Sequence, residues 1–294
     1  MLRIILFLAT NLAIILVASI TLSLLGFRGY LTENGINFNA LLIFCFVFGM
    51  AGSFISLLLS KFLAKTSTGT KLIDDNSRDA REIMVLQTVR QLAKQAGIGM
   101  PDVGIFPANQ ANAFATGFNK NHALVSISQG MLNRYTDSEI KAVLAHEVSH
   151  IANGDMVTMT LLQGVINTFV MFLARVIGYT ADKAIFKSKN TGPGYYIVVF
   201  LCEIILSIIA SIIVMWFSRV REYSADKGAA RMAGAHSMIA ALEHLQKESM
   251  MPNEMPKSLN AFAIAEGKHK GFSLANLFMS HPPLEKRIEA LRRG

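Results

Sequence analysis

The stretch AHEVSH, Ala145 to His150, places two histidines four residues apart with a glutamate directly after the first. Thr136 and Glu139 stand shortly before it and form a T-x-x-E capping signal. Apolar residues then recur at helical spacing as far as the region of Gly154. The stretch is therefore predicted to lie inside an amphipathic helix.

On such a helix, His146 and His150 project from one face and can offer both imidazoles to a single metal ion. Zinc is the metal that suits this pair of donors, and Glu147 stands beside it. The alternative is two core histidines with an incidental glutamate.

A catalytic zinc also needs a third protein ligand and an open position. A third histidine six residues after the second is excluded, because that position is Met156, and Asp155 points off the ligand face of the helix. The best candidate is Glu222 on a separate helix, with Asp226 one turn further on to orient a ligand imidazole. The alternative for Glu222 is a surface salt bridge with a neighbouring arginine.

The composition around this motif indicates a membrane protein. Of the 294 residues, 52% are hydrophobic and only 16% are charged, and the mean hydropathy is +0.41. Four apolar stretches carry the excess, each near the roughly 20 residues that cross a bilayer as a helix: about 4–25, 40–60, 156–174 and 195–217. We interpret the first as a retained anchor and not a cleaved signal peptide, because it is long and lacks a small-x-small cleavage site.

The net charge of +8 does not indicate a nucleic-acid partner. The basic residues gather near the ends of the apolar stretches, and no aromatic-interleaved basic segment occurs, so contact with lipid headgroups explains them better. Cys45 and Cys202 both fall inside apolar stretches, which argues against a disulfide framework or a thiolate metal site.

The polar pieces predict a small α+β domain. The first piece opens with a capped helix that ends near Gly97, followed by three short strands: Val103–Phe106, Asn112–Thr116 and Leu124–Ser128. The second piece continues the fourth apolar stretch as a helix, and a last helix starts at Pro282-Pro283 and runs through Arg293.

Four motifs together resemble the HtpX-type membrane metallopeptidases, relatives of the CAAX prenyl protease. They are HEVSH, the later R-x-x-E-Y-x-A-D segment, NAFATG at Asn112 to Gly117, and HPPLEKRIEAL at His281 to Leu291. The likeness runs over nearly the whole chain, including all four apolar stretches. It implies a gluzincin-like zinc endopeptidase of the bacterial inner membrane with its active site in the cytosol. The family acts in membrane-protein quality control and the stress response.

The resemblance also implies roles for individual residues. His146, His150 and Glu222 become the ligands of one Zn²⁺ per chain, and Glu147 becomes the catalytic base. Arg219 is expected either to hold Asp226 or Glu222 in place, or to contact a lipid headgroup.

Two further segments receive expectations from the resemblance. Asn112, Ala113, Phe114 and Ala115 resemble an edge strand that binds unfolded peptide by strand addition, the alternative being a core strand with Phe114 inward. His281 is expected to stabilise the oxyanion, to occupy the fourth zinc position in a resting state, or simply to cap the final helix.

The predicted fold is thus mainly α: a four-span helical membrane protein with a small α+β zincin-like metallopeptidase domain. Residues 1–64 and 156–217 form membrane hairpins, and residues 65–155 and 218–294 form the two parts of the peptidase domain. The expected substrates are unfolded or membrane proteins in the bilayer, and the expected partners include other membrane quality-control proteases.

Two other functions remain open at this point. One is a non-catalytic membrane scaffold with a structural zinc, and the other is a narrow processing protease of the CAAX type. The CAAX-type activity would need a lipid-sized cavity within the membrane, and four spans are few to enclose one.

Overall fold

The computed structural model describes residues 16–18, 20–24, 29–32, 35–185, 191–248 and 281–293. The chain divides into two compact units. The first comprises residues 1–56 and 158–214, and the second comprises residues 57–157 and 215–294. The structure is mainly helical with a small sheet, which confirms that part of the predicted fold.

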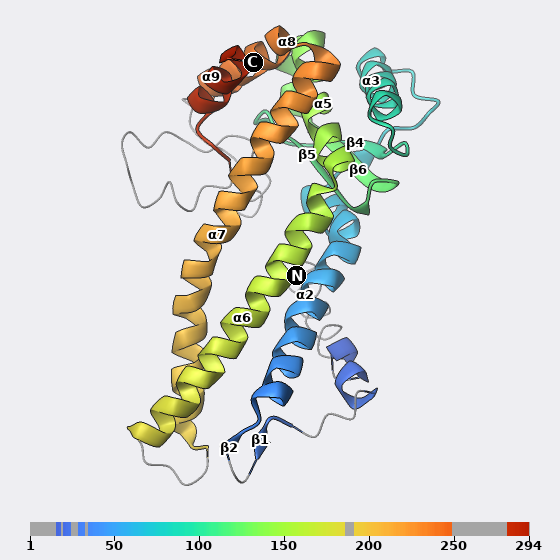
Figure 1. Ribbon diagram of the computed structural model, residues 1–294. Helices are drawn as coiled ribbons and strands as arrows, with labels where there is room; N and C mark the ends of the chain where they lie inside the picture. Colours follow the sequence, from blue (N-terminus) through green and yellow to red (C-terminus); the bar gives the residue numbers. More distant parts are fainter. Residues whose placement is uncertain are drawn as a thin grey trace. The chain divides into compact units, whose positions relative to one another are not determined.

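Three long apolar helices contribute to the first unit: α2 (Phe38–Thr68), α6 (Asp155–Ala184) and α7 (Pro193–Ala233), all labelled in Figure 1. Their most apolar windows have mean hydropathies of 2.4, 1.7 and 3.0, and at most 22% of any window is buried by protein, so lipid can cover the rest. They correspond to the second, third and fourth predicted spans. The first, 4–25, lies mostly outside the described residues, although 16–18 and 20–24 are helical. Three candidate spans are therefore observed, and a fourth is not established.

An ion pair joins two of the apolar helices in the first unit. Arg175 of α6 lies 2.7 Å from the Glu203 carboxylate of α7, and its guanidinium stands 5.4 Å from the Phe44 ring. A charge inside an apolar helix needs such a partner.

A hairpin of two short strands, β1 (Leu31–Thr32) and β2 (Gly35–Ile36), precedes α2.

The second unit contains a four-stranded sheet of order β3-β4-β6-β5. Its strands are β3 (Lys71–Leu72), β4 (Asp102–Phe106), β5 (Ala113–Asn119) and β6 (His122–Ser128). β4 runs parallel to β6, and β5 runs antiparallel to β6 as an edge strand. The three predicted strands are present, and β3 is an addition too short to detect from sequence.

The described residues of this unit also form five shorter helices: α3 (Ala80–Ala96), α4 (Gln129–Arg134), α5 (Asp137–Asn153), α8 (Ala235–Glu248) and α9 (Leu284–Arg293). α5 lies at the centre, in contact with α3, α8 and β5, while α9 packs beside α8, as Figure 1 shows. The last helix begins at Leu284, after the two prolines and not on them. The core of this unit is thus arranged around the helix that carries the two histidines.

Candidate metal centre

α5 is held at both ends by its own sequence. The Thr136 side chain accepts from the Glu139 backbone while the Glu139 carboxylate accepts from the Thr136 backbone, which is the predicted capping box. Gly154 ends the helix with φ 70°, a conformation that favours glycine, and its N–H bonds to the carbonyls of His150 and Ile151. The two ends of the helix that carries the histidines are therefore fixed by local hydrogen bonds.

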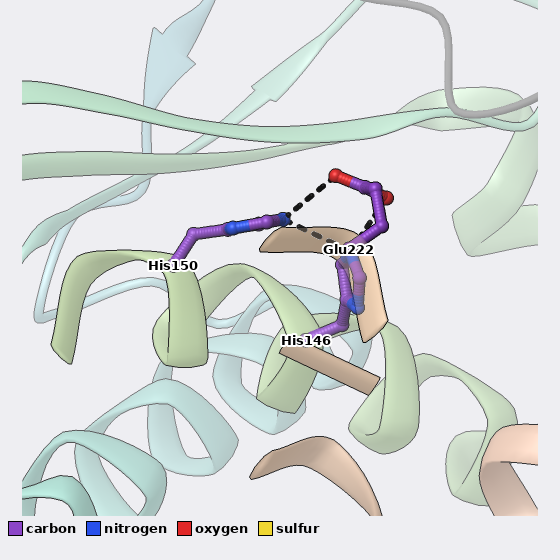
Figure 2. Close-up of side chains that lie close together, drawn as sticks. All are labelled: His146, His150 and Glu222. Atoms are coloured by element: carbon purple, nitrogen blue, oxygen red, sulfur yellow. Dashed lines mark hydrogen bonds and ion pairs between the residues drawn. The ribbon is translucent and has the colours of Figure 1, made fainter. Parts of the chain in front are cut away.

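His146, His150 and Glu222 come together as one group. One ligand atom from each lies within 4.8 Å of the others. Glu222 approaches the Nε2 atoms of His146 and His150 at 3.5 and 3.2 Å, and those two nitrogens are 3.1 Å apart. Figure 2 shows the two imidazoles and the carboxylate directed toward one point.

Small residues on α7 allow Glu222 to reach this point. Ala225 and Ala229 are fully buried, and a Cβ added to Gly228 would come within 2.4 Å of the Ser149 hydroxyl on α5. Helices approach this closely only where one side lacks a side chain. The segment after the last apolar stretch therefore brings its glutamate to the histidine helix.

Each imidazole is also fixed from behind. His146 Nδ1 lies 3.0 Å from Asp226, and His150 Nδ1 lies 2.5 Å from Asp155. A carboxylate on Nδ1 sets the ring orientation and directs the lone pair of Nε2 toward a metal. Asp226 occupies the position expected for it, whereas the sequence assigned no such role to Asp155. The sequence feature that could have indicated this role is the position of Asp155 as the first residue of α6, immediately after the glycine that ends α5.

The charge around the histidines favours a divalent cation. Four buried carboxylates, those of Glu147, Asp155, Glu222 and Asp226, surround them. Among the described residues, Arg221 approaches Asp155, and Arg287 approaches Glu222 and Asp226, so the four acids outnumber these two arginines. Two imidazoles and a carboxylate are the donors that zinc prefers, and its charge would balance this excess. The residues therefore fit the metal.

The histidine pKa values reflect the same excess. Burial lowers the pKa of His146, but hydrogen bonds to Asp226 and Glu222 outweigh it and leave the value raised. At His150, burial again lowers the pKa, while Asp155 and Glu222 raise it to about 10 overall. Both positions stabilise positive charge.

The remaining residues near the site differ in their contacts. Glu147 is 5% exposed and makes no hydrogen bond or ion pair with any residue in the described ranges. The guanidinium that contacts both Asp226 and Glu222 is that of Arg287, a residue the sequence did not single out, so the role expected of Arg219 stays a prediction. His281 Nδ1 lies 2.7 Å from Glu222, which brings this histidine to the site without deciding among its three interpretations.

The expected substrate strand is an edge of the sheet. β5 contacts α5 on one side and pairs only with β6 among the described strands. The Phe114 side chain is 5% exposed and packs at 5.4 Å from the Phe106 ring, so it points inward, as the alternative interpretation had it. The backbone N–H of Asn112 donates to the Ser128 hydroxyl, which ties this residue to the sheet. Any contact with a peptide would thus come from the strand backbone.

The sequence also matches a known protein family over the residues that form this site. The family model "Peptidase family M48" matches residues 79–294, a range that contains the whole centre. The chain belongs to peptidase family M48 and is a membrane zinc metalloprotease.

Individual relatives are similar over their full length. Protease HtpX of Pseudomonas syringae pv. syringae is 60% identical over 296 residues, covering 100% of this chain and 99% of the relative. Protease HtpX of Hahella chejuensis is 60% identical over 292 residues, covering 99% of each. The crystal structure of S. mikatae Ste24p matches with a TM-score of 0.58 at 18% identity, over 86% of this chain and 58% of that one, and so supports the fold alone.

Proposed function

We propose that this protein is an endopeptidase of the bacterial inner membrane that cleaves misfolded or damaged membrane proteins from the cytosolic side. The observation that carries the proposal is the convergence of His146, His150 and Glu222, with the buried Glu147 next to His146 in the sequence. The full-length likeness to bacterial proteases supports it.

The chemistry assigns a separate task to each group. His146, His150 and Glu222 hold the ion, with Asp155 and Asp226 orienting the two imidazoles. A zinc ion bound there would polarise the scissile carbonyl and acidify the attacking water. Glu147 takes the proton of that water and passes it to the leaving amine.

Two surrounding residues complete the proposed assignment. His281 contributes near the oxyanion from its position beside Glu222. Arg219 supports the acidic residues of α7 or contacts headgroups.

Substrate recognition by β5 fits unfolded chains. Asn112 to Ala115 lie at an edge of the described sheet, where the strand backbone would pair with an extended peptide, and pairing of this kind depends little on side chains. Broad specificity suits a quality-control enzyme, whereas a CAAX-type processing enzyme must recognise one modified end.

The proposed organisation is a multi-pass membrane part, residues 1–64 and 156–217, and a peptidase part, residues 65–155 and 218–294. Basic residues near span ends, including Arg3, Lys61 and Lys65, favour the cytosol for the peptidase part. His146 and Glu222 flank the third and fourth spans, so those two spans either both cross the membrane or both fail to cross.

The direct test is purification in detergent, followed by chelation, zinc add-back and a casein-cleavage assay. We expect chelation to abolish cleavage, zinc to restore it, and Glu147→Gln to retain zinc while losing activity by about 100-fold or more. Undiminished proteolysis by Glu147→Gln would refute the mechanism. Stoichiometric zinc without any cleavage would favour the scaffold, and cleavage confined to prenylated tails would favour the processing enzyme.

A further inference from the structure

Arg287 is the largest fully buried side chain in the described part of the chain. It is fully buried, whereas Arg292 on the same helix is 62% exposed in its side chain and pairs with Glu243 at the surface. Burying a guanidinium costs several kcal/mol unless well-placed acids compensate it. The acids that contact Arg287 should therefore explain why α9 contains a buried arginine.

Those contacts connect two acids of α7 to one side chain of α9. Arg287 Nε and Nη2 donate to the two carboxylate oxygens of Asp226 at 2.8 and 2.6 Å, a bidentate pair. The third nitrogen, Nη1, lies 3.3 Å from Glu222 Oε2. Asp226 and Glu222 stand one turn apart on α7, so one planar group spans both.

The same acids act on the metal ligands. Asp226 holds His146, and Glu222 is itself a member of the ligand group. Among the described residues, both Arg287 Nη1 and Glu222 Oε2 are buried and lack a hydrogen bond. The contact between them is thus an electrostatic one, and the same Oε2 atom also lies 2.7 Å from His281 Nδ1.

From this geometry we infer that Arg287 is a positioning residue for the metal centre: it sets the third ligand and the His146 orientation together, which makes α9 part of that centre. The inference rests on the proposed metal-binding function of the site. The competing explanation is that Arg287 only neutralises buried acid, which any cation could do. A lysine separates the two, because a single ammonium cannot bind Asp226 through two nitrogens and also reach Glu222.

The experiment compares Arg287→Lys with Arg292→Lys, the exposed arginine of the same helix, and with the wild-type chain in detergent. Zinc affinity is measured by competition with a chromophoric chelator, and the ligand field is read from the visible absorption of the Co²⁺-loaded protein. We expect Arg287→Lys to bind zinc about 10- to 100-fold more weakly and to change the Co²⁺ spectrum. Arg292→Lys should match wild type in both.

Equal affinity and an unchanged spectrum in folded Arg287→Lys would overturn the inference while leaving the proposed function intact. A wild-type chain that binds neither metal would instead overturn the proposed function, and the inference with it. The two failures are therefore distinguishable.

A second measurement covers the case in which Arg287→Lys does not fold. If docking of α9 favours metal binding, metal binding must favour docking of α9 by the same factor. Hydrogen exchange of the wild-type α9 amides should then slow when zinc is added. Slower exchange in α5 with no change in α9 would refute the coupling.

Discussion

Replacing Asp155 with asparagine tests how far the metal centre depends on the carboxylate behind His150. Asp155 lies 2.5 Å from His150 Nδ1, and both side chains are largely buried, with 10% and 14% exposed. Asparagine keeps the shape and an oxygen that accepts from the imidazole, so the substitution removes mainly the charge. Solvent screens such a buried contact weakly.

The expected magnitude follows from the loss of that charge. A hydrogen bond to a charged group is worth about 1.5–3 kcal/mol, and one between neutral groups about 0.5–1.5 kcal/mol. The difference of roughly 1–1.5 kcal/mol corresponds to about a tenfold loss in zinc affinity. Asp155→Ala also removes the acceptor and should lie toward the hundredfold end of the range for groups that orient metal ligands, about 10- to 100-fold.

The assay is zinc competition with a chelator on detergent-purified protein, with circular dichroism to verify the fold. Asp137→Asn is the matched control, because Asp137 stands in the first turn of α5 with 69% of its side chain exposed and pairs with Arg81. That change should leave zinc affinity unaltered and cost at most about 1 kcal/mol of stability. Zinc affinities of both Asp155 variants within threefold of wild type would show that the carboxylate does not orient the ligand.

Three further predictions concern the remaining residues. His146→Ala, His150→Ala and Glu222→Ala should each lose metal together with activity, and normal zinc binding by Glu222→Ala would transfer the third-ligand role to another residue. For His281→Ala, an oxyanion role predicts slower turnover with zinc retained, a resting-state ligand predicts raised basal proteolysis, and a cap predicts only a lower melting temperature. In the loop between the last two spans, Lys189→Cys should react with an impermeant thiol reagent from outside intact cells, and labelling only after lysis would contradict a full crossing.

The ligand-bearing elements could be predicted because their signals are local. The capping box at Thr136, the glycine at Gly154 and the spacing of His146 and His150 all act within one helix, so pattern alone identifies them. The apolar stretches that became α2, α6 and α7 are equally local. Glu222 could be proposed because zinc requires a third ligand and few acids lay in a suitable segment.

The supporting residues depend on tertiary contacts and could not be derived in this way. Asp155 was judged only as a ligand, since its position two residues beyond the end of α5 does not by itself reveal that its carboxylate turns back to Nδ1 of His150. Arg287 lies within the HPPLEKRIEAL motif. Because the helix also has basic residues at its end, the sequence alone predicts that Arg287 is another charged residue on the surface. Only the packing of α9 reveals its burial.

If β5 binds substrate as proposed, its position at the edge of the sheet has a consequence for which proteins would be cut and how fast. An edge strand pairs with a backbone whose own hydrogen-bonding groups are unpaired, and a folded domain offers almost none. When local opening is rapid compared with cleavage, the rate for each target then follows the fraction of time that its segment is open. β5 would thus select substrates by their conformational stability. A loss of about 1.4 kcal/mol in the free energy of unfolding of a membrane protein would raise its rate of removal about tenfold, without any change in its sequence at the cut site.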